Sequence, residues 1–251
     1  MKTHTDALLA NILSTGYVES EGGKRIKLHS SISAEQGKAV QSLAKEAKAS
    51  SILELGLAYG VSTLFLAPIA KAADKGSYIV CDPEQDWWEQ IGLLNLERSG
   101  LRSFVDFRPQ GARQTILDLV SESAKIDFVF LDYIKVFDMM LVDFALLDSL
   151  LEPGAILVFD DCSYPGIRKL CRLIAQLPHY EICFTFGKDK QSPRRRLMST
   201  LVEAVTFAPL SPGDRFPKRQ PSDSSLGVNY FCLGFRKIGT DSRNWDWHAS
   251  F

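Results

Sequence analysis

Three carboxylates and one amine follow apolar runs in the second half of the chain, at a spacing that could support catalysis. The run IDFVFL is followed by Asp132, with Lys135 three residues later, and the run AILVF is followed by Asp160 and Asp161. Unpaired carboxylates in a poorly solvated cleft repel each other, so a positive group is expected among them. A hard divalent cation such as Mg²⁺ is the natural candidate, because it binds oxygen and keeps waters that a substrate can replace.

Each of these residues also has an ordinary structural interpretation. One aspartate could cap the helix that follows, another could face solvent, and Lys135 could be a solvated surface lysine. Beside a metal ion and partly shielded from water, Lys135 would have a lowered pKa and could act as a general base.

A second group of polar and glycine residues follows the earlier apolar run SILEL, in the stretch ELGLAYGVST. It contains Glu54, Gly56, Gly60 and Ser62. Glycines in a strand-to-helix turn let the backbone approach a ligand. The spacing E-x-G-x-x-x-G differs from the dinucleotide-binding G-x-G-x-x-G, since Ala58 stands where a middle glycine is often found. A tight turn without a ligand is the alternative.

Two other strand ends carry residues that could contact a nucleoside. Asp82 follows the apolar run SYIVC and could accept both hydroxyls of a ribose, or cap a helix. Arg113 and Gln114 lie in the stretch GARQ and could flank or hydrogen-bond an adenine, or form an ordinary first helical turn.

A parallel sheet is the element that can bring these residues together. Apolar runs of strand length alternate with helical patterns, which is typical of βαβ units, and ligands bind beyond the carboxyl ends of such strands. Two late runs predict an antiparallel pair, and Ser33 with Gln36 predicts a capping box. The expected strands are 51–55, 77–82, 104–108, 126–132, 155–161, 180–186 and 229–237, and the expected helices are 5–13, 33–48, 60–73, 86–99, 112–123, 137–150 and 165–176.

Composition narrows the class of protein. The chain has 251 residues, of which 45% are hydrophobic and 24% charged, with a net charge of −1. The net charge near zero argues against nucleic acid as a partner. No apolar stretch is long enough for a signal peptide or a membrane span. The five scattered cysteines predict reduced core residues, so we expect a cytoplasmic protein.

Taken in order, the glycine turn, Asp82, GARQ, Asp132-x-x-Lys135 and DDCSYPG (160–166) resemble the class I S-adenosylmethionine-dependent methyltransferases. Within them the chain is most similar to the metal-dependent O-methyltransferases of the catechol and caffeoyl-CoA type, over roughly residues 28–186. The resemblance implies an α/β, Rossmann-like fold. Its sheet would have seven mostly parallel strands with an antiparallel last strand, and helices would cover both faces.

The resemblance also implies roles for individual residues. Lys135 would be the general base, Asp132, Asp160 and Asp161 would bind Mg²⁺ or another divalent cation, and Pro165 would line the acceptor pocket. The residues implied for S-adenosyl-L-methionine are Ile32, Glu54, Gly56, Gly60, Ser62, Asp82, Ala112, Arg113, Gln114 and Asp132.

The implied activity is methylation of a hydroxyl group on a small organic molecule. The alternatives are a metal-independent methyltransferase, or a protein of this fold that catalyses another reaction. Two departures from the family pattern stand out: the third metal ligand is Asp161 instead of Asn, and Tyr133–Ile134 replaces an aromatic residue that often follows the metal aspartate.

The domain organisation follows from the same resemblance. Residues 1–50 would form a helical cap segment and residues 51–251 the methyltransferase domain. An insert at about 187–228 is rich in Pro, Ser and Arg, with Arg194–Arg196 in its middle, and it would be a lid or an oligomer contact. A homodimer is expected by analogy with similar proteins.

Overall fold

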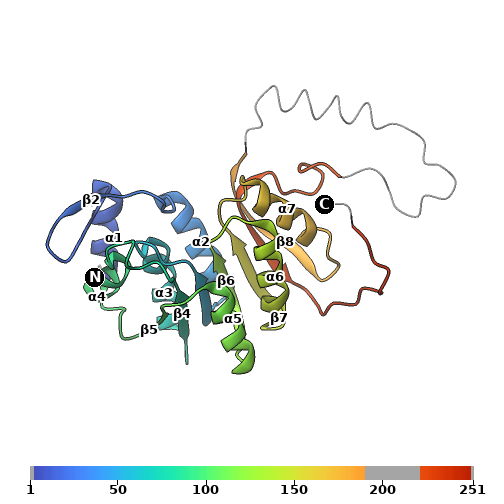
Figure 1. The fold of residues 1–251 in the computed structure, drawn as a ribbon, viewed down its shortest axis with the longest axis horizontal. Helices are drawn as coiled ribbons and strands as arrows, with labels where there is room; N and C mark the ends of the chain where they lie inside the picture. The colour runs from blue at the N-terminus through green and yellow to red at the C-terminus, as the bar shows by residue number, and fades with distance from the viewer. Residues whose placement is uncertain (1–2, 190–220, 250–251) are drawn as a thin grey trace.

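A seven-stranded sheet forms the centre of the protein (Figure 1). The computed structural model describes residues 3–189 and 221–249. The strand order is β5-β4-β3-β6-β7-β9-β8, and a separate two-stranded hairpin is formed by β1 and β2. The strands are β1 (Tyr17–Glu19), β2 (Arg25–Lys27), β3 (Ser51–Leu55), β4 (Ser77–Cys81), β5 (Val105–Arg108), β6 (Ile126–Leu131), β7 (Leu151–Phe159), β8 (Tyr180–Lys188) and β9 (Tyr230–Lys237).

The direction of chain progression reverses between β3 and β6. The chain runs outward from β3 to β4 and β5, returns to β6 beside β3, and then continues to β7 in the opposite direction. These strands are parallel, whereas β9 is antiparallel to both β7 and β8. The boundary between β3 and β6 is therefore the switch point at which open α/β sheets bind ligands.

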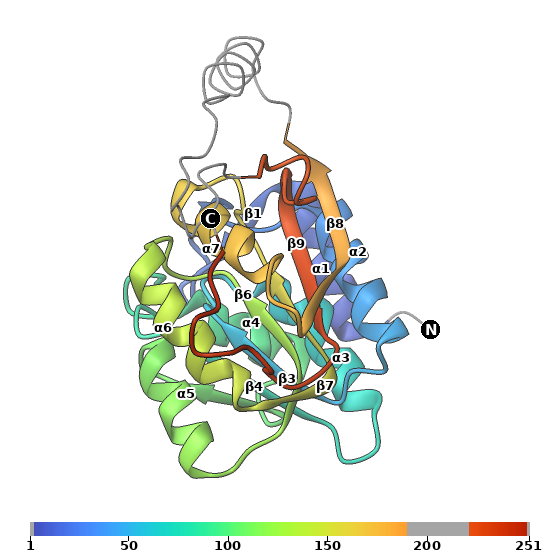
Figure 2. The same cartoon turned by 90° about the vertical axis from the view of Figure 1, so that its right-hand side faces the viewer.

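Helices cover both faces of the sheet, so the predicted fold class is confirmed (Figure 2). Along β6, Phe128 and Phe130 face the cluster packed by α1–α4, while Val129 and Leu131 face the cluster packed by α5–α7. The helices are α1 (His4–Thr15), α2 (Ala34–Glu46), α3 (Val61–Ala72), α4 (Ile91–Ser99), α5 (Ala112–Ser121), α6 (Phe137–Asp148) and α7 (Pro165–Ile174).

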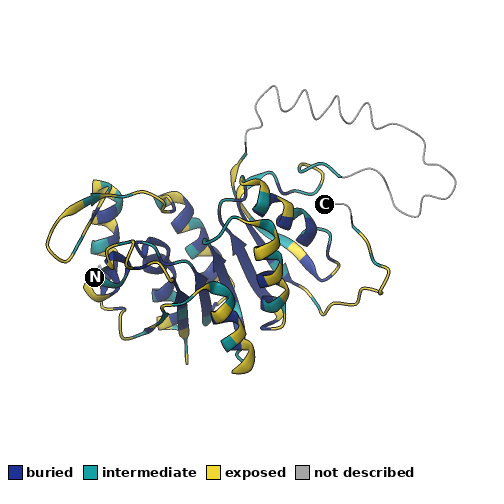
Figure 3. Ribbon diagram, in the orientation of Figure 1, coloured by how far each residue is buried: buried dark blue, intermediate teal, exposed yellow. Residues whose placement is uncertain are grey.

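Burial follows this layering: the central strands β3 and β6 are buried, the edge strand β8 is largely half-buried or exposed, and the outer faces of the helices are exposed (Figure 3). All five cysteines are free, and four of them are buried. Among the described residues, no helix has both the length and the apolar composition needed to cross a membrane. The segment 190–220, which includes Arg194–Arg196, lies outside the described residues, so the role of the insert stays a prediction.

The N-terminal segment shares the core of the sheet. Leu9 of α1 and Val40 of α2 belong to the same hydrophobic cluster as Phe65 of α3. Gly37 brings α2 especially close, because a Cβ at this position would lie 2.1 Å from the ring of Phe65. The division at residue 50 stays a prediction, although residues 3–50 do pack on the main sheet.

Candidate functional site

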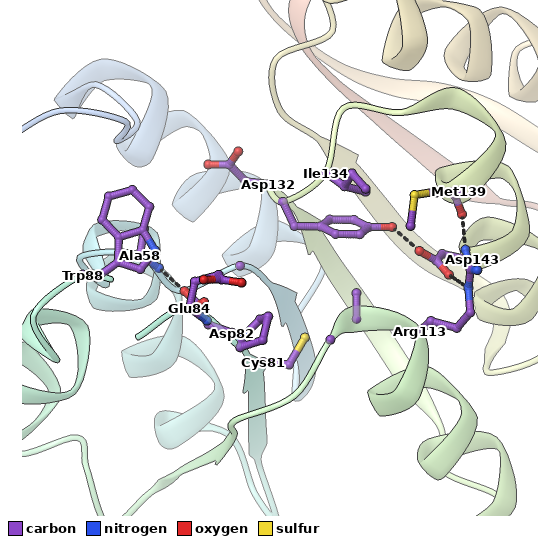
Figure 4. Close-up of a pocket in the computed structure, with 15 residues that line it drawn as sticks. Ala58, Cys81, Asp82, Glu84, Trp88, Arg113, Asp132, Ile134, Met139 and Asp143 are labelled. Carbon is purple, nitrogen blue, oxygen red and sulfur yellow. Dashed lines mark hydrogen bonds and ion pairs between the residues drawn. The ribbon is translucent and has the colours of Figure 1, made fainter. Parts of the chain in front are cut away.

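A cavity of about 560 Å³ opens beyond the carboxyl ends of the strands on the β3–β5 side and at β6 (Figure 4). Trp88 and Glu84 lie at one end, and Arg113 and Asp143 at the other. The volume lies within the range of small-molecule sites. The lining residues are Gly56, Ala58, Cys81, Asp82, Pro83, Glu84, Trp88, Gly111, Ala112, Arg113, Asp132, Tyr133, Ile134, Met139 and Asp143.

Gly56 and Asp132 meet at the switch point between β3 and β6. Gly56 has a φ of 101°, and a Cβ on it would lie 2.1 Å from the Asp132 carbonyl oxygen. Both residues also line a second, smaller cavity with Ile32 and Ser62. Glycine is required here for two reasons, since the backbone is left-handed and the two chain segments approach too closely for a side chain.

The turn after β3 is held by Asp82 at the end of β4. The backbone N–H groups of Leu57 and Ala58 donate to Asp82 Oδ2, at 3.2 and 2.7 Å, and Gln85 donates to the same oxygen at 3.0 Å. The Glu84 N–H donates to Oδ1 at 2.7 Å. Asp82 therefore shapes the glycine turn, and its Oδ1 keeps capacity for one further donor such as a ribose hydroxyl.

Glu54 lies beneath this turn and lines neither cavity. Its Oε2 accepts hydrogen bonds from Thr63 at 2.5 Å and from Tyr78 at 2.6 Å, and the side chain is fully buried. Burial raises the pKa of Glu54 to about 7, although the hydrogen bonds from Thr63 and Tyr78 oppose the shift. Its Oε1 has no hydrogen-bond partner within the described part of the chain. This buried oxygen could accept a donor from a ligand in the adjoining second cavity, which Ser62 lines.

Gly60, another residue expected at the cofactor, begins α3. It is the N-cap residue, with a φ of 76°, and it lines neither cavity. Its contribution is to the turn, because the left-handed conformation favours glycine.

At the far end of the cavity, a buried acid joins two elements. Asp143 of α6 accepts a hydrogen bond from Arg113 Nε at 2.8 Å and one from the Tyr133 hydroxyl at 2.8 Å. Arg113 also donates to the Met139 carbonyl oxygen at 2.9 Å. Ala112 and Arg113 thus line the cavity as expected, whereas the exposed Gln114 turns to Asp118 and does not.

Lys135 lies between two of the three predicted metal ligands. Its Nζ is 2.7 Å from Asp132 Oδ1 and 3.0 Å from Asp161 Oδ2. Burial acts to lower the pKa of Lys135, but the two carboxylates outweigh it and the pKa is raised. The expectation of a lowered pKa assumed a metal ion beside Lys135 and stays a prediction, because the nearest charges here are the two carboxylates.

Asp160 is oriented by a residue from the other end of the chain. Gln36 Nε2 and the Asp161 N–H each donate to Asp160 Oδ1 at 2.7 Å. Gln36 and Asp160 are both buried, and burial together with Asp132 raises the pKa of Asp160 to about 6. Only half of the predicted capping box forms: the Gln36 N–H donates to Ser33, while the Gln36 side chain turns to the acid.

The chemistry of this donor set fits a hard cation. Three carboxylates follow two adjacent strands, and oxygens of Asp132 and Asp161 already converge on one positive charge. The third acid is turned toward Gln36, and residues 3–189 and 221–249 contain no group of three or more His, Cys, Asp or Glu side chains arranged to hold a metal ion.

The sequence did not single out several residues of this site. Glu84, Trp88 and Asp143 line the cavity, and the Gln36 side chain donates a hydrogen bond to Asp160, at the acidic end of the site formed by Asp132, Asp160 and Asp161. Asp143 carried a usable signal, since it is an acid within the apolar helix FDMMLVDFALLD. Gln36 carried none, because its type and position also suit a helix cap.

Known proteins resemble this chain in sequence. A family model described as a methyltransferase domain matches residues 53–162. The chain is 32% identical over 162 residues to a catechol O-methyltransferase from Niastella koreensis, a match that covers 64% of this chain and 68% of the relative. It is 30% identical over 138 residues to caffeoyl-CoA O-methyltransferase 3 from Nicotiana tabacum, covering 53% of this chain and 54% of the relative.

Solved structures share the fold. An O-methyltransferase from Bacillus cereus in complex with S-adenosylhomocysteine aligns with a TM-score of 0.56 at 23% identity, over 72% of this chain and 83% of that one. The O-methyltransferase TomG from Streptomyces achromogenes, in complex with S-adenosylmethionine, aligns with a TM-score of 0.60 at 17% identity, over 96% of this chain and 91% of that one.

Proposed function

The chain belongs to the S-adenosylmethionine-dependent O-methyltransferases of the catechol and caffeoyl-CoA type, and from this premise we propose that it methylates a hydroxyl of a small organic acceptor. In this proposal Asp132, Asp160 and Asp161 hold a divalent cation, and Lys135 takes the proton. The observation that carries it is the place of Asp132, which lines both cavities and also contacts Lys135.

The lining of the two cavities supports cofactor binding at this place. Gly56 lets the backbone approach a ligand at the switch point, and Ile32 and Ser62 line the second cavity beside it. In this proposal the Oε1 of Glu54, which has no hydrogen-bond partner among the described residues, would accept a hydrogen bond from the amino group of the cofactor. S-adenosylmethionine supplies the methyl group, and a divalent cation supplies a lowered pKa for a hydroxyl bound to it.

The protein's own contribution is mainly positional. Holding an acceptor oxygen and a methyl group in line can lower a barrier by up to roughly 7–11 kcal/mol. Asp132, which lines the cavity, holds Lys135 through an ion pair, and Lys135 can accept a proton only after it has given one up. Because its pKa is raised by Asp132 and Asp161, that role requires its ion pairs to loosen.

The ion pairs of Lys135 with Asp132 and Asp161 favour a second candidate function, which is methyl transfer without a metal ion. Here the Lys135 ammonium itself provides the positive charge among the carboxylates, and it would face the acceptor oxygen. The two candidates share the cofactor and the acceptor class, and they differ in what EDTA does to turnover.

The test supplies the purified protein with S-adenosylmethionine and either catechol or caffeoyl-CoA, and measures S-adenosylhomocysteine. We expect turnover with Mg²⁺ and its loss in EDTA; full turnover in EDTA would select the metal-free candidate. Lys135→Ala should lose most turnover while keeping its affinity for S-adenosylhomocysteine, and Lys125→Ala, at an exposed ion pair with Glu152, controls for loss of charge. Unchanged turnover in Lys135→Ala would remove Lys135 from the mechanism.

Three finer expectations belong to the same proposal. The acceptor class is inferred from the relatives, and the two probes test it directly. A cytoplasmic location and a homodimer are also proposed, and the molar mass of the purified protein from light scattering tests the dimer.

A further inference from the structure

The acidic end of the site contains a cation that belongs to the chain. Lys135 Nζ lies 2.7 Å from a carboxylate oxygen of Asp132 and 3.0 Å from one of Asp161. These acids follow different strands, β6 and β7, and the Lys135 side chain is only 24% exposed. A shielded ammonium held by two carboxylates forms shorter and stronger contacts than a solvated surface lysine does.

The backbone around Lys135 is fixed, so this contact is built into the loop. The Asp132 N–H donates to the Leu55 carbonyl oxygen at 3.0 Å, which ties the start of the loop to β3. Gly166, in the first turn of α7, packs on the other end of the loop: a Cβ there would lie 2.4 Å from the Lys135 carbonyl oxygen. Lys135 is thereby held within reach of both acids.

The third carboxylate does not join the ion pair. Asp160 Oδ1 is occupied by the Gln36 amide and by the Asp161 N–H. The point at which Asp132 and Asp161 converge therefore has two negative charges and one positive charge around it. A divalent cation bound through the same two oxygens would need the place where the ammonium now lies.

We propose that the Lys135 ammonium and a divalent cation exclude each other at Asp132 and Asp161, so that a cation binds only when Lys135 withdraws. The inference rests on the cation site of the proposed function and adds a property of the chain, which is a built-in competitor that weakens metal binding. Oxygen ligands approach Mg²⁺ to about 2.0–2.1 Å. An ammonium in contact with the same oxygens would then lie against the ion, where like charges repel strongly.

The test measures binding of Mn²⁺ alone to the full chain, from the electron paramagnetic resonance signal of free Mn²⁺. Lys135→Met removes the competitor and keeps the apolar stem of the side chain. Lys169→Met is the matched control, because it removes the same charge from α7, where Lys169 lies over the ring of Phe137 (4.6 Å). We expect Lys135→Met to bind Mn²⁺ at least about tenfold more tightly than wild type, and Lys169→Met to stay within about twofold.

Each possible result either supports or overturns the proposed competition between the Lys135 ammonium and a divalent cation. Equal tightening in both variants would mean a general charge effect, and unchanged or weaker binding in Lys135→Met would mean that Lys135 does not compete; either result overturns the proposal. A third result is that neither wild type nor Lys135→Met binds Mn²⁺ while both bind S-adenosylhomocysteine. That result would refute both the proposed competition and the proposed metal site, and it would leave cofactor-dependent methyl transfer in place. Lys135→Gln repeats the comparison if Lys135→Met fails to bind S-adenosylhomocysteine and to melt cooperatively.

Discussion

Replacing Glu54 by Gln tests whether the acid beneath the glycine turn is a buried structural charge. The wild-type carboxyl is fully buried, and burial raises its pKa from 4.5 to about 7. Between these two values the folded state binds more protons than the unfolded state. Stability therefore falls as the pH rises through this window, and the cost of the buried charge is fully present above the folded pKa.

The size of the effect follows from the shift. One pKa unit corresponds to about 1.36 kcal/mol, so ionised Glu54 costs about 3 kcal/mol at high pH. Between about pH 5 and pH 8, linkage predicts a loss of about 2–3 kcal/mol from this one group. Glu54→Gln cannot ionise, so its free energy of unfolding relative to wild type should rise by that amount over the same range.

Urea unfolding of both proteins at several pH values provides the measurement. A fixed offset between them is expected, because the amide satisfies Thr63 and Tyr78 differently from the carboxylate. The pH-dependent part carries the test, since other titrating groups cancel in the difference. Glu46→Gln, at an exposed position near the end of α2, controls for the change of charge and should give a flat difference. A difference for Glu54→Gln that varies by less than about 0.5 kcal/mol would refute the reasoning.

Three further changes test the contacts that assemble the site. Gln36→Leu removes a 2.7 Å hydrogen bond to the Asp160 carboxylate and should lower the free energy of unfolding in urea by about 1.5–3 kcal/mol. Gln41→Leu, on the same helix, removes a 2.7 Å hydrogen bond to a neutral carbonyl and should lower it by only about 0.5–1.5 kcal/mol. Equal losses in the two variants would contradict this prediction. Gly56→Ala places a Cβ 2.1 Å from the Asp132 carbonyl oxygen at the switch point. We expect it to weaken the binding of S-adenosylhomocysteine, measured by calorimetry, by more than about tenfold. Binding within about twofold of wild type would show that the turn can adjust. Tyr133→Phe removes a donor from buried Asp143 and should cost about 1–3 kcal/mol of unfolding free energy; no loss would mean that water replaces the hydroxyl.

Most of the sheet was predictable because its strands are near-continuous apolar runs. The errors occur where polar residues interrupt or replace that signal. Strand β7 begins at Leu151 instead of 155, since the exposed residues 152–154 conceal its start. Helix α4 begins at Ile91 instead of 86, because Glu89 and Gln90 adopt positive φ and end the preceding turn. The hairpin β1–β2 was missed because each of its strands has only three residues.

The sequence predicted which residues lie at the site better than it predicted the contacts between their side chains. Sequence position alone sends Asp132, Asp160 and Asp161 to neighbouring strand ends. Which acid pairs with Lys135 depends on side-chain geometry and on Gln36, which lies 124 residues from its partner along the chain. The direction of the Lys135 pKa depends on the same geometry, since two carboxylates within 3.0 Å outweigh burial.

The strand order explains why one carboxylate serves both halves of this site. Chain progression reverses between β3 and β6, so the residues after these two strands are neighbours although they are 76 positions apart, Gly56 from Asp132. On the β3 side the turn leads to the two cavities, and on the β6 side the loop leads to Lys135. A Cβ on Gly56 would lie 2.1 Å from the Asp132 carbonyl oxygen, so the two segments pack directly against each other at this point. The glycine turn and the loop that carries Lys135 are therefore in direct backbone contact.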